Sequence, residues 1–239
     1  MHRVLFSLRN GFLPVFAVFS IVFAGSVSPS HAALISYSFS GTVATDLTGS
    51  PLAGTFSFGQ NVTGSFVVDT SVPDADGGPI FGFFPGALAS ISVDIGGYAA
   101  SATNGTADTA DNAGGYDGVG LAAFINAGHL AGSAAVTGAS VGGLDLGGIL
   151  LSLTDSTETA LPNDSLPNPI SLSGFDSIYG VLEFYDPSDL EADLNSLVFS
   201  LETLEAAAAV PEPGTLAVLG LGLAGLGLAR RSRRQRHPA

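Results

Sequence analysis

The chain lacks several residue types, and each absence excludes a class of function. It has no cysteine, which excludes a disulfide framework and thiolate metal sites, and no tryptophan. All seven basic residues lie near the two ends, so the stretch between residues 33 and 209 contains neither lysine nor arginine. Because phosphate groups are bound mainly by these two residue types, nucleic acid is excluded as a partner of this stretch.

Acidic residues are abundant in the same stretch. The chain has 21 Asp and Glu residues and a net charge of −14; Glu212 is one of them, which leaves 20 between residues 33 and 209. His129 is the one histidine there, so the stretch provides neither the ligands of a zinc site nor a convincing nucleophile–base pair. We therefore expect a non-enzymatic protein. Glycan hydrolysis by two carboxylates stays open as an alternative, because that chemistry needs no other side chain. Its candidate acids are Glu158, Glu183, Glu191, Glu202 and Glu205.

Short alternating segments run through the middle of the chain and are separated by Gly, Asp, Asn and Pro. This pattern is typical of strands joined by turns, and no segment before residue 200 has a helical period. It predicts an all-β fold, an antiparallel β-sandwich of the jelly-roll type, over residues 33–204, with a linker at 205–209. The region after Thr154 is expected to be a long ordered crossover loop. The predicted strands are 35–39, 55–58, 65–68, 89–95, 98–100, 119–124, 148–153, 179–185 and 197–204.

Two acidic loops are candidate calcium sites. One contains Asp74 and Asp76, and the other contains Asp108, Asp111 and Asp117, in both cases beside glycines. Carboxylate and carbonyl oxygens are the ligands that calcium prefers, although neither loop has EF-hand spacing. The same residues also make good turns without any metal, and we favour that interpretation. A calcium-dependent carbohydrate-binding or adhesive module is therefore an alternative function, and no other cofactor is expected.

The first 32 residues have the organisation of a secretory signal peptide. Arg3 and Arg9 precede an apolar stretch over residues 11–27. Small residues at Ser30 and Ala32 then suit cleavage by signal peptidase before Ala33. The sequence thus predicts export through the inner membrane.

The other end has a second apolar run followed by a basic cluster. Residues 215–229 are uninterrupted by charge and, as a helix, cover roughly 22 Å of a hydrocarbon core of about 30 Å. A start at Pro213 and snorkelling arginines close most of the difference. The pattern predicts a single-pass transmembrane helix with a cytoplasmic C-terminus, stopped by Arg230, Arg231, Arg233, Arg234 and Arg236.

Directly before this run stands the segment Val210-Pro211-Glu212-Pro213. Residues 210–239, with this motif, the short Leu/Gly-rich run and the arginine cluster in order, resemble the PEP-CTERM sorting signal. The resemblance implies recognition by an exosortase, cutting near the Pro-Glu-Pro sequence, and transfer to the cell surface or an extracellular matrix, where exopolysaccharide is a candidate partner. Three segments of the middle region, residues 36–42, 64–71 and 164–175, also look like segments that recur in exported PEP-CTERM proteins.

The absence of lysine and arginine from residues 33–209 leads to a prediction about the stability of the folded domain. Self-repulsion among 20 acids should destabilise the folded domain at low salt, so added sodium chloride should raise its melting temperature. If either acidic loop holds calcium, millimolar calcium should raise it further than magnesium at equal ionic strength. Equal melting temperatures in the two cations would remove the calcium hypothesis.

Overall fold

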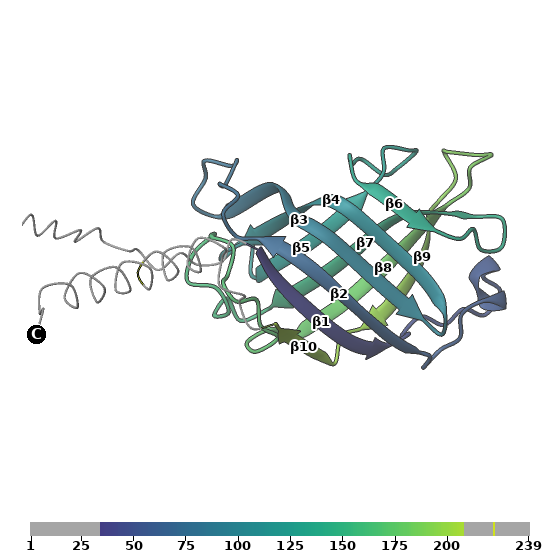
Figure 1. The fold of residues 1–239 in the computed structure, drawn as a ribbon, viewed down its shortest axis with the longest axis horizontal. Helices are drawn as coiled ribbons and strands as arrows, with labels where there is room; N and C mark the ends of the chain where they lie inside the picture. Colours follow the sequence, from purple (N-terminus) through teal and green to yellow (C-terminus); the bar gives the residue numbers. More distant parts are fainter. Residues whose placement is uncertain (1–33, 208–221, 223–239) are drawn as a thin grey trace, which may run out of the picture. The chain divides into compact units, whose positions relative to one another are not determined.

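The computed structural model describes residues 34–207 and Gly222 (Figure 1). The predicted signal peptide, its cleavage residues Ser30, Ala32 and Ala33, the sorting motif and the arginine cluster lie outside the described residues.

Within the described part, ten strands form one antiparallel sheet in the order β10-β1-β2-β3-β4-β5-β7-β8-β9, and β6 pairs with β4. Most neighbours in the sheet are neighbours in the chain. A two-residue turn at Gly96-Gly97 joins one pair, and longer segments join the others. A single turn of 3-10 helix, η1, covers Pro51–Gly54. The strands are β1 (Leu34–Thr42), β2 (Asn61–Asp69), β3 (Phe81–Ile95), β4 (Tyr98–Ala110), β5 (Asp117–Phe124), β6 (Ala135–Gly138), β7 (Asp145–Asp155), β8 (Ser177–Tyr185), β9 (Asn195–Ser200) and β10 (Thr203–Ala206).

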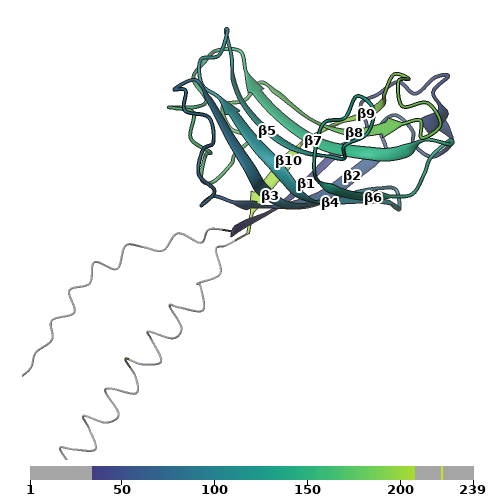
Figure 2. The ribbon, with the colours of Figure 1, turned by 90° about the horizontal axis from the view of Figure 1, so that it is seen from above.

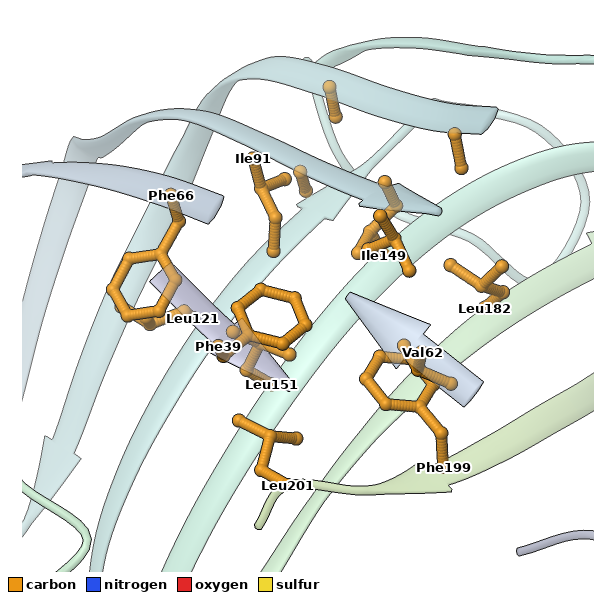
Figure 3. Packing of buried hydrophobic residues seen from close by; sticks show 14 of the residues in the cluster. Phe39, Val62, Phe66, Ile91, Leu121, Ile149, Leu151, Leu182, Phe199 and Leu201 are labelled. Atoms are coloured by element: carbon orange, nitrogen blue, oxygen red, sulfur yellow. The ribbon is translucent and has the colours of Figure 1, made fainter. Parts of the chain in front are cut away.

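The sheet curls, so that β1 to β4 face β7 to β9 across a continuous apolar core (Figure 2). Alternate residues of each strand point inward, as the period of two requires. Phe39 from β1 stacks on Phe199 from β9, with ring centroids 6.3 Å apart (Figure 3). Tyr37 stacks on Phe66, with ring centroids 4.7 Å apart. Burial of such aromatic and aliphatic side chains is the main source of stability here, because the chain has no cysteine and residues 33–209 contain neither lysine nor arginine.

The curled sheet closes where β1 and the residues next to it contact β9 and β10. The amide of Ala44 donates to the Val198 carbonyl at 2.9 Å, and the amide of Glu202 donates to the Ser40 carbonyl at 2.8 Å. Gly41 makes this approach possible, because a Cβ there would lie 1.7 Å from the carbonyl oxygen of Ser200. The chain then passes from β9, which pairs with β8, to β10, which pairs with β1.

Two long loops pack apolar side chains against the core. Residues 43–60 contribute the buried Leu52 and Phe56, and residues 156–176 contribute the buried Leu161 and Ile170. The second loop is fastened by the amide of Ile170, which donates to the Tyr37 hydroxyl at 2.9 Å.

The all-β, antiparallel prediction is confirmed, with two facing parts of one curled sheet in place of two separate sheets. The strand predicted at 55–58 is wrong: the segment is a loop in which Phe56 is buried against the core and Phe58 is exposed, whereas residues two apart in a strand would share a face. The loop at 156–176 is ordered but is not a crossover, because β7 and β8 are direct partners. Glu205 and Ala206, placed in the linker from sequence, belong to β10, because β1 offers them a free edge.

Gly41 provides a test of the closure between β1 and β9. Gly41→Ala should lower the free energy of unfolding by about 3 kcal/mol, because the new methyl group overlaps a backbone carbonyl that cannot move alone. Gly77→Ala is the matched control, since a Cβ there meets nothing within 4 Å. Chemical denaturation measures both, and equal stabilities for the two variants would contradict this account of the closure.

Candidate functional site

The two acidic loops singled out from sequence lie side by side in the structure. Strands β3 and β4 pair so that Phe83 stands opposite Asp108. The amide of Phe83 donates to Asp74 Oδ1 at 2.8 Å, and the amide of Asp111 donates to the carbonyl of Ile80 at 2.8 Å. The pairing of two strands thus brings together loops that are more than thirty residues apart in the chain.

These carboxylates do not form a cluster. Among the described residues, no three His, Cys, Asp or Glu side chains are grouped as a metal site would require. Asp74 Oδ1 also accepts from the amide of Asp76 at 2.9 Å, and Asp111 Oδ1 accepts from the side chain of Asn112 at 2.8 Å. The oxygens shape turns, as the simpler interpretation expected, and calcium binding stays a prediction.

Asp117 on β5 and Asp108 on β4 lie on opposite sides of the sheet. Asp108 pairs with Gly120 of β5, and Asp117 is three residues before Gly120, so its side chain faces the other way. Its side chain is fully buried and accepts from the amides of Asn112 and Leu161, each at 2.8 Å. Asp155, on the neighbouring strand β7, stands directly opposite Asp117 and is also buried. The sequence did not single out Asp155. Asp117 thus joins the loop before β5 to the loop after β7.

Asp155 holds the start of the 156–176 loop. It accepts from the hydroxyl of Thr157 at 2.6 Å, from the amide of Thr159 at 2.8 Å and from the amide of Ala160 at 3.0 Å. These donors, with the Thr157 hydroxyl foremost, keep the pKa of the Asp155 carboxyl well below its usual range.

A groove of about 370 Å³ lies on the outer face of β3, β4, β5 and β7, which are neighbours in the sheet (Figure 1). The strand register arranges the residues that line the groove in two parallel rows. One row crosses the sheet as Phe83, Asp108, Gly120 and Ser152, and the other as Phe81, Ala110, Gly118 and Thr154. The groove therefore has an aromatic wall on β3, a floor of small residues and a hydroxyl wall on β7.

Three aromatic side chains border this groove and remain exposed to solvent. Phe81 is 50% exposed, Phe83 is 45% exposed and Tyr116 is 40% exposed. The Tyr116 ring lies over Gly118, since a Cβ at that glycine would come within 3.3 Å of the ring. The sequence motifs did not single out these aromatics. The available signal was the run from Phe81 to Phe84, which places phenylalanine on both faces of one strand.

Asp108 is the one carboxylate among the residues that line the groove. Its carboxylate lies over Gly120, where a Cβ would be 2.4 Å from Oδ2. Burial against the sheet raises the pKa of this carboxyl, because desolvation disfavours its charged form. The described residues provide no hydrogen-bond donor to it, unlike the carboxylates that hold turns.

The catalytic candidates from sequence do not assemble around this groove. His129 lies beyond the opposite end of β5, and its Nε2 donates to the carbonyl of Glu191 at 3.1 Å. Glu183 accepts from Ser196 Oγ at 2.7 Å and Glu202 accepts from Thr42 Oγ1 at 3.1 Å. None of the five glutamates considered for hydrolysis lines the groove.

A second hollow lies on the outer face of β2, β3, β4 and β6. It measures about 510 Å³ and is bordered by small polar side chains without aromatic rings. Its polar residues are Thr63, Ser65, Ser92, Asp94, Ser101 and Thr137.

The lowered pKa of Asp155 predicts that the free energy of unfolding depends on pH. Because its pKa is lowered in the folded state, its ionised form stabilises the fold fully above the pKa of an unfolded Asp, about 3.9. That contribution is lost as the pH falls through the lower folded pKa. In urea unfolding, Asp155→Asn should therefore be less stable than wild type at neutral pH, with a smaller difference in acid. Asp193→Asn, at an exposed acid without a hydrogen bond in the described part, is the control. A difference that is the same at both pH values would contradict the assignment.

Comparisons with known proteins concern the C-terminal end. Within residues 34–207 and at Gly222, no helix is long and apolar enough to span a bilayer; nearly all of the predicted anchor lies outside them. Searches of curated proteins and of solved structures found no match to the chain. The family model described as the PEP-CTERM protein-sorting motif matches residues 209–234, which contain Val210, Pro211, Glu212 and Pro213. The chain therefore carries the sorting motif of the PEP-CTERM family, which marks it as an exported protein addressed to an exosortase.

Proposed function

We propose that this protein is processed by an exosortase and then acts in the cell envelope or extracellular matrix, where its β domain has a non-enzymatic interaction role. The observation that carries the proposal is the outer groove: it combines exposed Phe81, Phe83 and Tyr116 with a single carboxylate, Asp108. Such a surface suits contact with a partner. It lacks the paired groups that acid–base or nucleophilic catalysis needs.

A carbohydrate-binding module is a second candidate. Exposed aromatic rings beside a concave surface offer stacking faces for sugar rings, and the three aromatics stand next to both acidic loops. Calcium dependence of such binding has less support, because Asp74 and Asp117 already accept backbone hydrogen bonds. Glycan hydrolysis has less support still, because the groove presents one carboxylate and the reaction needs two.

The proposal is tested through the sorting motif in a host that has an exosortase. The released protein should begin at Ala33 and should have lost its tail near Pro211–Pro213, which intact-mass analysis measures. Replacing Pro211 and Pro213 by Ala should retain the protein in the inner membrane, because a helix could then continue into the segment that the enzyme grips. Pro187→Ala, at an exposed loop residue of the domain, is the control and should be released normally. Released protein that still carries Arg230–Arg236 would overturn the processing step.

A further inference from the structure

We propose that the groove bordered by Phe81, Phe83 and Tyr116 binds an amino-sugar chain, with a sugar ring against the aromatic side chains and a protonated amine on the Asp108 carboxylate. This inference rests on the proposed non-enzymatic function and deepens its carbohydrate candidate by naming the class of sugar.

Asp108 carries a charge that no described residue matches. The side chain is partly buried against Gly120, and the described residues give it no hydrogen bond. Residues 33–209 include no lysine or arginine, so this stretch provides no Lys or Arg side chain to neutralise Asp108. An ammonium group would offset the desolvation of the carboxylate and donate charge-assisted hydrogen bonds to it.

The shape of the groove suits a sugar ring more than a bare ion. About 370 Å³ falls within the usual range of small-molecule sites, roughly 300–1,000 Å³. The small floor residues Ala110, Gly118 and Gly120 let a ligand come close to the sheet between aromatic and hydroxyl walls. The aromatic wall offers apolar surface for the C–H groups of a sugar, and Ser152 and Thr154 offer hydrogen bonds to its hydroxyls. A metal ion fits less well, because no other carboxylate lines the groove.

The long-range electrostatic field of the domain also favours a cationic ligand. Twenty acids without a compensating base repel uronate-rich or sulfated chains and attract a polycation. A neutral sugar would stack on the same rings, but it would leave the charge of Asp108 unpaired. The cationic amino sugar satisfies both features of the groove.

The test compares two oligomers of equal length, one of β-1,4-linked glucosamine and one of its fully N-acetylated form. Isothermal titration calorimetry uses the full chain in detergent at a pH of about 6, where a carboxylate and an amine are both charged. The glucosamine oligomer should bind at least about tenfold tighter, equivalent to about 1.4 kcal/mol. Asp108→Asn should remove this preference, and Phe83→Leu should weaken both interactions. Asp193→Asn removes one charge outside the groove and should leave the preference unchanged.

The variants also report whether the fold is intact. Asp108→Asn should melt at or above the temperature of wild type, because it removes a desolvated charge without altering side-chain size. Equal affinity for the two oligomers would overturn the proposal in favour of a neutral glycan. Absence of binding to either oligomer, or an unchanged preference in Asp108→Asn, would overturn it as well. None of these results bears on tail processing, so the proposed function and its sugar specificity fail separately.

Discussion

Carboxylates in this domain are stabilised by amides and hydroxyls, because residues 33–209 contain no lysine or arginine to pair with them. The recurrent device is an aspartate that accepts from both the amide and the hydroxyl of the Ser or Thr two residues later. This arrangement lowers the pKa of Asp46, Asp155 and Asp186, with the hydroxyl as the largest cause. The pairs are Asp46 with Thr48, Asp69 with Ser71, Asp155 with Thr157, and Asp186 with Ser188.

The lack of lysine and arginine also explains why Asp108 differs from the aspartates in turns. A carboxylate in a turn has nearby backbone amides, but Asp108 stands on the outer face of a paired strand, where the amides are already used by the sheet. Its neighbours are the Phe83 side chain and the backbone of Gly120, neither of which donates to it. The groove therefore combines apolar surface with an uncompensated charge, which is a specific chemical requirement for a ligand.

The curl of the sheet explains several features that local patterns did not predict. Once β9 returns to β1, Gly41 has to be small, and the segment over residues 43–60 packs Phe56 against the core. The sequence of residues 55–58 alternates as a strand would, but the core takes up Phe56 and leaves Phe58 exposed. A buried Tyr37 hydroxyl and a buried Asp117 likewise bind the loop at 156–176, although they are more than forty residues away in the chain.

The sequence by itself determined the all-β class, the acidic surface and the sorting motif, because composition, a period of two and a short contiguous motif are local properties. It also located turn-forming aspartates such as Asp74. Only the tertiary structure decided that Asp108 and Asp117 face opposite sides of the sheet and that Phe83 stands beside Asp108. Register and curl set these relations, and both depend on pairing between strands distant in the chain, which no local window of sequence contains.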